Sequence, residues 1–257
     1  MPTSLFLKSA TPYARIREKG FGLRKAGVHC TVWRQSPMNA PSNNDRSYRA
    51  CFWFLVVGFA VFRLVLAGHF GLSTDESHYV MYSRRLAWGY FDHPPMVAFL
   101  AALTTWFGEG LFWYRLGPIL CWSGSVILMR ALVLTLYRDE AVAFWASVIL
   151  MLMPVQHLLS IALLPDAPLN VFWCGALLAS WHAFRGGRWG WWLLGGACIG
   201  GALLSKYHGV LLGLTLLGYL ITSAETRRWL RTPKPYAAVL VGCLVFVPNI
   251  LWNGQHA

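Results

Sequence analysis

The chain has 257 residues, of which 56% are hydrophobic and 12% are charged, and its mean hydropathy is +0.47. A soluble domain carries about 25% charged residues, so this composition excludes an ordinary soluble protein. The net charge of +12 would suggest nucleic acid in a soluble protein, but the basic residues lie mostly in the N-terminal tail and in short loops. We therefore expect no nucleic-acid partner and instead contact with membrane lipids.

The first 48 residues differ from the rest because they are polar and basic. They contain no apolar run typical of a cleavable signal, and residues 36–44 are rich in Ser, Pro and Asn. The sequence predicts a disordered cytoplasmic tail over 1–48, with Met1 and Met38 both left open as the start. Residues 49–257 form the membrane domain.

Apolar runs of the length that crosses a bilayer, about 20 residues, recur along the membrane domain. The predicted spans are 51–70, 116–136, 141–160, 168–184, 189–205, 208–223 and 236–252. The apolar segment 96–107 is too short to span and predicts an interfacial or re-entrant helix. The fold class is therefore all-α, a polytopic transmembrane helix bundle with an outer-face loop that contains short interfacial helices.

The topology follows from the basic loops. If 96–107 does not cross, the basic tail and the basic segments 138–140, 185–188 and 227–234 share one side, as cytoplasmic loops do. The opposite, outer side then holds Asp75, Glu76, Asp92, His93, Asp166 and Lys206. Arg63, inside the first span, must snorkel or find a partner.

Two further patterns point to packing. The six cysteines form no Cys-x-x-Cys pair and five of them lie in or beside apolar runs, which indicates buried apolar side chains. Gly196 and Gly200 form a small-xxx-small surface that favours close helix packing.

Asp75 and Glu76 are the main acidic pair. Carboxylates at a membrane boundary are expensive to desolvate, so we interpret them as functional, although a solvated loop or a cap for a helix near Ser77 is the alternative. Asp92 and His93 could bind a divalent metal or a phosphate, or precede a helix that starts at Pro94 and Pro95. Asp166 fits the N-cap of the next span.

Cations on the outer side oppose the usual charge trend. Lys206 is either an interface snorkeller or a phosphate contact. Arg84, Arg85 and Arg115 also lie outside, and such cations indicate an anionic ligand, which we expect to be a lipid phosphate. A carboxylate base with cations at the membrane surface suits transfer from a lipid-phosphate donor.

Several motifs resemble the family 39 glycosyltransferases, which include dolichyl-phosphate-mannose protein mannosyltransferases and bacterial aminoarabinose transferases. The motifs are 74–79, 89–95, 164–168, 203–207 and 248–253, in order over about residues 50–257. The resemblance implies a GT-C fold and an inverting membrane glycosyltransferase. Such an enzyme moves a sugar from a polyprenyl-phosphate donor to a lipid, glycan or protein on the outer face of a bacterial inner membrane.

The resemblance also implies residue roles. Asp75 matches the proposed catalytic base, with Glu76 beside it, and Asp92 matches an acidic position that can take part in binding a divalent metal. His93 stands where the aminoarabinose transferases have a lysine near the donor phosphate. With the outer-face cations Lys206, Arg84 and Arg85, it completes the expected donor-phosphate set. Asp166 matches a second outer-face acid.

Family members are usually about twice this long, which keeps two alternatives open. One is a truncated, non-catalytic membrane paralogue that binds lipid phosphate or scaffolds a partner. The other is a small transporter, ranked last because the acids gather at one face and no internal repeat is visible. The sugar, the acceptor and the oligomeric state stay open.

Overall fold

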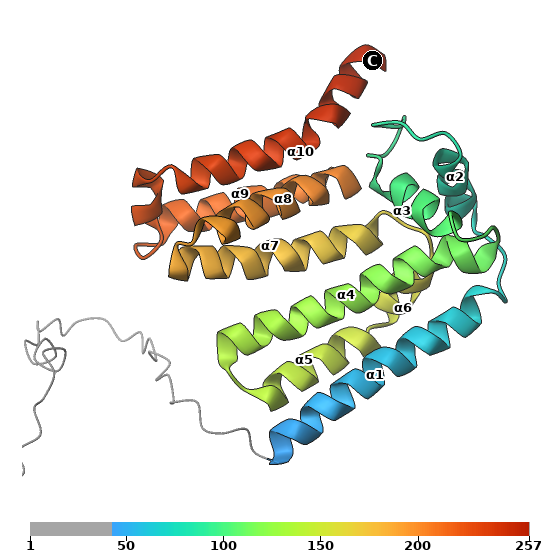
Figure 1. Cartoon of the computed structure of the whole chain (residues 1–257), viewed down its shortest axis with the longest axis horizontal. Coiled ribbons are helices and arrows are strands. Elements are labelled where there is room, and N and C mark those ends of the chain that lie inside the picture. The colour runs from blue at the N-terminus through green and yellow to red at the C-terminus, as the bar shows by residue number, and fades with distance from the viewer. Residues whose placement is uncertain (1–42, 257) are drawn as a thin grey trace, which may run out of the picture. The chain divides into compact units, whose positions relative to one another are not determined.

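The structure, a computed structural model, describes residues 43–256, which contain helices and no strand. The helices are α1 (Asn43–Ala67), α2 (Thr74–Ser83), α3 (Met96–Thr105), α4 (Leu111–Tyr137), α5 (Glu140–Leu152), α6 (Pro154–Ile161), α7 (Asp166–Gly186), α8 (Trp189–Ser205), α9 (Gly209–Thr222), the short 3-10 helix η2 (Arg227–Arg231) and α10 (Lys234–His256). Figure 1 shows them as a bundle of long helices with α2 and α3 gathered at one end. The predicted all-α fold class is confirmed.

Each of the seven predicted spans corresponds to helix, but the helices differ in length. Within residues 43–256, α1, α4 and α10 are long and apolar enough to cross a membrane, and α5 with α6 makes a fourth if that pair, bent by 71°, is one span. The remaining predicted spans are α7, α8 and the 14-residue α9. At 1.5 Å per residue α9 covers about 21 Å, less than the roughly 30 Å of a bilayer core. The expected short helix over 96–107 is α3, with 10 residues.

The helices pack in the order α10, α8, α7, α4, with α5 and α1 on the far side of α4 and α9 against α8 (Figure 1). Glycines set the closest approach. A Cβ on Gly196 would lie 2.1 Å from the carbonyl oxygen of Ala238, and one on Gly200 would lie 2.8 Å from the carbonyl oxygen of Gly242. The predicted small-residue surface is therefore the contact between α8 and α10.

Hydrogen bonds and ion pairs connect the loops and helix ends at each of the two ends of the bundle. At one end, Arg49 of α1 pairs with Glu140 of α5, and the indole of Trp229 donates to the carbonyl of Phe184. At the other end, α2, α3, the start of α7 and the end of α10 come together (Figure 1). The basic loops and the polar motif residues thus lie at opposite ends of the bundle, as the topology predicts.

Arg63 of α1 finds its partners inside the bundle. Its side chain is fully buried, its Nε donates to the hydroxyl of Ser160 at 2.5 Å, and its guanidinium carbon lies 3.6 Å from the ring centroid of Trp122. Nη2 lies 3.1 Å from Nδ1 of His157. These contacts hold α6 against α1 and α4.

Two expectations need adjustment. The predicted tail over 1–48 lies mostly outside the described residues, but 43–48 are helical, because α1 begins at Asn43 with a polar turn before its apolar run. The cysteines are also less buried than predicted. In the described part of the chain Cys51 and Cys243 are exposed and Cys121, Cys174 and Cys198 are half-buried, and all five are free thiols.

Candidate active site

The site is built on α2, whose start is fixed by a capping box. The hydroxyl of Ser73 accepts from the backbone N–H of Glu76 at 3.3 Å, and the Glu76 carboxylate accepts from the backbone N–H of Ser73 at 3.0 Å. This exchange satisfies two of the N–H groups that a helix start leaves free. It sets the direction in which Asp75, one residue earlier, leaves the helix.

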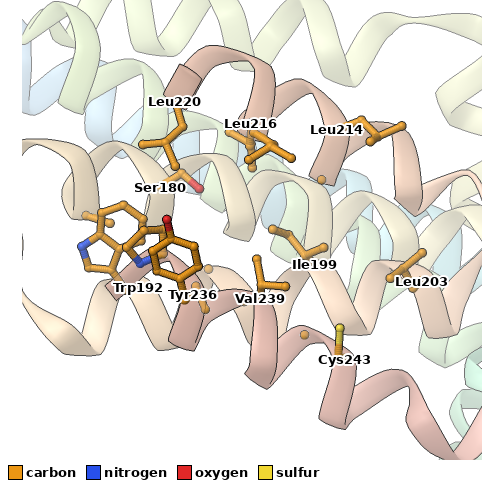
Figure 2. Close-up of a pocket in the computed structure, with 18 of the residues that line it drawn as sticks. Ser180, Trp192, Ile199, Leu203, Leu214, Leu216, Leu220, Tyr236, Val239 and Cys243 are labelled. Carbon is orange, nitrogen blue, oxygen red and sulfur yellow. The ribbon is translucent and has the colours of Figure 1, made fainter. Parts of the chain in front are cut away.

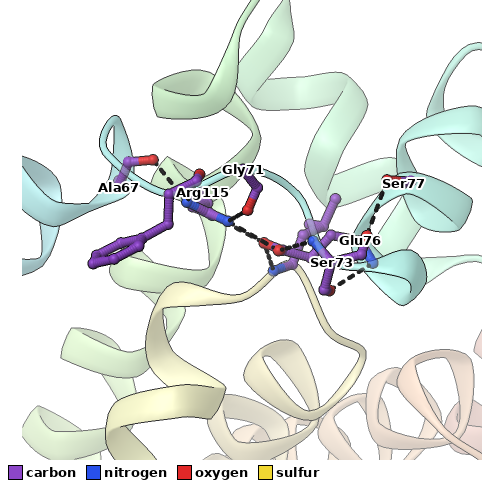
Figure 3. A network of polar contacts seen from close by, with 8 residues as sticks. Ala67, Gly71, Ser73, Glu76, Ser77 and Arg115 are labelled. Carbon is purple, nitrogen blue, oxygen red and sulfur yellow. Dashed lines mark hydrogen bonds and ion pairs between the residues drawn. The ribbon is translucent and has the colours of Figure 1, made fainter.

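Glu76 is also half of a buried ion pair with Arg115 of α4 (Figure 3). Nε and Nη2 of Arg115 each lie 2.9 Å from a Glu76 carboxylate oxygen, and the side chains are 3% and 4% exposed. The guanidinium also donates to the carbonyls of Ala67, Phe70 and Gly71. The backbone N–H of Leu163 donates to Glu76 at 3.1 Å. One pair therefore joins the end of α1, the start of α2, α4 and the loop before α7.

The surroundings of Glu76 keep it ionised. Burial pushes its pKa up, but hydrogen bonds from Arg115 and from the backbone of Ser73 and Leu163 outweigh burial, so the net pKa is lowered. Every contact of this carboxylate is structural. We therefore revise the catalytic role expected for Glu76 to a positioning role. The lipid phosphate expected at Arg115 is replaced by Glu76 and three backbone carbonyls.

Asp75, in contrast, is exposed on the first turn of α2, and its carboxylate accepts no hydrogen bond from the described residues. Its charge acts on a buried tyrosine together with the charges of two other acids. The pKa of the buried Tyr79 is raised to about 12 by burial and then by the charges of Asp92, Asp75 and Asp166. The structure thus gathers three acids from three separate motifs around one tyrosine.

Asp92 sits in a network of tyrosine and histidine side chains. The hydroxyl of Tyr82 donates to Oδ1 of Asp92 at 2.6 Å, and Nδ1 of His93 lies 2.9 Å from Oδ2. Burial acts to raise the pKa of Asp92, but the contacts with Tyr82 and His93 outweigh it and hold the pKa below its usual value. Tyr82 stacks on Tyr90 with ring centroids 3.8 Å apart. The loop that carries Asp92 is therefore bound to α2.

These contacts bear on whether Asp92 and its neighbours could bind the expected divalent metal ion. Nδ1 of His93 lies 2.9 Å from Asp92 but forms no hydrogen bond with the described residues, and Nε2 lies 3.4 Å from the hydroxyl of Tyr79. Among residues 43–256 no group of three His, Cys, Asp or Glu side chains is placed to hold a metal ion. The described residues around Asp92 do not by themselves form a metal site.

Asp166 and Lys206 form the third part of the site. Nζ of Lys206 donates to both carboxylate oxygens of Asp166 at 2.9 and 3.1 Å, and the two side chains are 28% and 26% exposed. The expected N-cap role of Asp166 is wrong, because Pro165 is the N-cap residue of α7 and no side chain caps it. Asp166 instead fixes the position of Lys206, whose ammonium group has a third N–H to offer.

The other expected phosphate ligands differ in position. His93 lies within the cluster, between Asp92 and Tyr79. Arg84 is exposed at the end of α2, where a hydrogen bond that it donates to the Tyr114 oxygen and the charges of Tyr114 and Glu109 raise its pKa, so it faces the start of α4. Arg85 is exposed and makes no side-chain hydrogen bond or ion pair with the described part of the chain. Of the four expected phosphate ligands, His93 and Lys206 are thus the two that contact Asp92 and Asp166.

The last motif closes the site from α10. The buried side-chain amide of Asn249 donates to the backbone carbonyl of Trp88 at 2.8 Å, and Asn253 donates to the hydroxyl of Tyr207 at 3.2 Å. Gly89 leaves room for this contact, since a Cβ there would lie 2.4 Å from the Trp252 ring. Tyr79, Tyr82 and Asn249 were not predicted as site residues. The spacing of Tyr79 and Tyr82 from Asp75, four and seven residues along one helix face, is the signal that would have found them.

Comparisons with known proteins identify the family to which the chain belongs. A family model described as dolichyl-phosphate-mannose-protein mannosyltransferase matches residues 92–252. The lipid A galacturonosyltransferase RgtD of Rhizobium johnstonii is 28% identical over 209 residues, which make up 79% of this chain and 43% of that protein. The undecaprenyl phosphate-alpha-4-amino-4-deoxy-L-arabinose arabinosyl transferase of Pseudomonas aeruginosa is 30% identical over 224 residues, 76% of this chain and 39% of the relative.

A solved structure shows the same fold. The S. cerevisiae protein O-mannosyltransferase Pmt1-Pmt2 complex bound to the sugar donor aligns with 84% of this chain and 35% of the matched chain, at a TM-score of 0.52 and 21% identity. The chain spans about 40% of the length of the two bacterial relatives. Since the family model covers more than half of its residues, the chain belongs to the dolichyl-phosphate-mannose-protein mannosyltransferase family, as the sequence motifs predict.

Proposed function

We propose that this chain is part of a membrane glycosyltransferase that transfers a sugar from a polyprenyl-phosphate donor to an envelope acceptor. The observation that carries the proposal is the position of Tyr79, which contacts His93, the neighbour of Asp92 at 2.9 Å, and is exposed to the charges of Asp75, Asp92 and Asp166. Membership of the family gives this cluster its chemistry, and the bacterial relatives named above are both sugar transferases. Those names favour an enzyme over the non-catalytic alternative.

Asp75 is the proposed general base. Its carboxylate is exposed and free of hydrogen bonds to the described residues, so it can accept the proton of an acceptor hydroxyl. The acceptor oxygen then bonds to the anomeric carbon, the bond from that carbon to the phosphate oxygen breaks, and polyprenyl phosphate leaves. A single displacement of this kind inverts the anomeric centre.

Lys206 is the proposed contact for the leaving phosphate. Asp166 holds its ammonium in place while the side chain stays partly exposed, so the charge is positioned before the phosphate develops its extra negative charge. His93, whose Nε2 lies 3.4 Å from the hydroxyl of Tyr79, is a second candidate contact. Arg84 and Arg85 make no contact with Asp92, His93, Asp166 or Lys206, so they are weaker candidates for the phosphate contact.

The proposed location is a bacterial inner membrane, with α2 and α3 at the outer face and the N-terminus in the cytoplasm. The basic loops at the opposite end of the bundle support this orientation. Single cysteines introduced at exposed Glu109 and Glu225 and labelled with an impermeant thiol reagent test it. Labelling of the Glu109 position alone in intact spheroplasts is expected, and labelling of the Glu225 position alone would reverse the orientation.

The function is tested by supplying membranes that contain the full-length protein with polyprenyl phosphates that carry different radiolabelled sugars. Label is expected to pass to a membrane acceptor from one of these donors, and Lys206→Met is expected to reduce the transfer. Membranes without the protein are the control. Equal labelling with and without the protein would contradict the proposal.

A further inference from the structure

A second site lies away from the acids, in an apolar cavity of about 350 Å³ between α7, α8, α9 and α10 (Figure 2). Its lining is almost wholly aliphatic and aromatic, and exposed Leu214, Val239 and Cys243 from α9 and α10 stand at its open side. From Trp191 to Leu203, both in the lining, α8 advances twelve residues, or about 18 Å. The cavity is therefore elongated along α8 and open to the side. An extended hydrocarbon chain requires a cavity of this shape.

One end of the cavity meets a ring of positive charge. Phe184, Leu230 and Pro235 line the cavity, and each is next in sequence to a cation, namely Arg185, Arg231 and Lys234. We call the five exposed arginines of this end the basic rim: Arg185, Arg188, Arg227, Arg228 and Arg231. None of them forms an ion pair with a carboxylate of the described residues.

The basic rim is held together by a built framework. Trp229 of η2 packs its ring where a Cβ on Gly187 would lie, 2.1 Å away, and its indole N–H donates to the carbonyl of Phe184. Lys234 donates to the carbonyl of Gly187 at 2.6 Å. These bonds fix η2 against the turn between α7 and α8, so arginines from both segments lie at the same end of the bundle, next in sequence to residues that line the cavity.

An unused hydrogen-bond donor lies between the rim and the cavity. Trp192 is 4% exposed and lines the cavity, its ring lies 5.8 Å from that of Trp229, and its indole N–H has no partner among the described residues. A buried donor without a partner is costly, so a ligand with an acceptor oxygen would gain by reaching it. The ester carbonyl of a phospholipid lies between its chains and its phosphate, as Trp192 lies between cavity and rim.

We infer that this cavity and the basic rim form a binding site for an anionic phospholipid, with an acyl chain in the cavity and the phosphate at the arginines. Aromatic residues favour the membrane–water boundary, and Trp181, Trp189, Trp191, Trp229 and Tyr236 gather at this end. Basic residues at such a boundary select anionic over neutral head groups. The inference does not depend on catalysis, because the candidate active site is at the opposite end of the bundle.

The test is native mass spectrometry of the purified full-length protein with phosphatidylglycerol and phosphatidylcholine of the same chains. The wild type is expected to retain phosphatidylglycerol on the order of tenfold better, and Arg228→Gln with Arg231→Gln to remove that preference. Arg46→Gln, an exposed change outside the rim, should keep it. Equal retention of the two lipids by the wild type would overturn the inference.

The cavity is tested by a matched pair on α9. A Cβ on Gly213 meets only the side chain of Ile199, at 3.5 Å, so Gly213→Leu fills the cavity and should lower retention of both lipids. Gly218→Leu, where a Cβ meets nothing within 4 Å and which lies outside the lining, should not. Equal retention by the two variants would contradict the placement of the chain. Loss of phosphatidylglycerol to equimolar undecaprenyl phosphate would overturn the inference by assigning the cavity to the donor chain.

Discussion

Glu76 and Arg115 form a two-pronged ion pair inside the protein, although Glu76 stands next to the residue proposed as the catalytic base. The pair fixes the first turn of α2 to α4, to the end of α1 and to the loop before α7. Because Asp75 is the adjacent residue, its position depends on this pair. The buried acid holds the helix and the exposed acid is left for chemistry.

Breaking this pair should cost stability. Glu76→Ala leaves the Arg115 guanidinium buried without its carboxylate, and such a loss costs about 3–5 kcal/mol. Thermal unfolding in detergent is expected at a clearly lower temperature than for the wild type. Asp75→Asn is the matched control and should unfold as the wild type does. An unchanged unfolding temperature for Glu76→Ala would contradict the structural role.

The same pair predicts loss of stability in acid. The pKa of Glu76 is lowered in the folded state, so its stabilising contribution is complete above its ordinary value of 4.5 and is lost as pH falls through the lower folded value. The unfolding temperature of the wild type should therefore drop as the pH is reduced below about 4.5. In Glu76→Gln that part of the acid dependence should be absent. The same acid dependence in both proteins would argue against this assignment.

Gly196 predicts a packing defect. Gly196→Ala places a methyl group 2.1 Å from the Ala238 carbonyl oxygen and should force α8 and α10 apart, with a loss of about 1–3 kcal/mol. Gly190→Ala, on the same helix but with nothing within 4 Å, should be neutral or slightly stabilising. Denaturant unfolding followed by helix content measures both. Equal stability of the two variants would show that the glycine contact is not needed.

Lys206 and Asp166 predict different losses of activity. Lys206→Met removes the proposed phosphate contact and should lower transfer by about 10²–10³-fold. Asp166→Asn keeps Lys206 but removes the carboxylate that holds its ammonium in place, so the loss of transfer should be smaller than for Lys206→Met. Initial rates of sugar transfer at several donor concentrations distinguish the two. A greater loss for Asp166→Asn would indicate that Asp166 itself acts on a substrate.

The sequence predicted the helices and which loops share an end of the bundle, because a membrane requires apolar runs in its core and favours basic loops on one side. It also brought Asp75, Asp92, Asp166 and Lys206 to one side. It did not predict that Asp75 and Glu76 have different roles, because Arg115, the partner of Glu76, is 39 residues away from it in the sequence and only the fold brings the two together. The Ser73-x-x-Glu76 spacing was the local signal for a capping box. Asp166 and Lys206 each had a plausible local role, and their pairing appears only when α7 and α8 pack.

The role of Asp75 as the general base is tested most directly by comparing Asp75→Asn with Glu109→Gln. Glu109 is an exposed acid at the same end of the bundle. Each full-length variant is given saturating polyprenyl-phosphate sugar, and the rate of transfer to the acceptor is measured alongside its unfolding temperature. We expect a loss of about 10²–10⁴-fold for Asp75→Asn at wild-type stability, and a wild-type rate for Glu109→Gln. A wild-type rate for Asp75→Asn would contradict its role as the base.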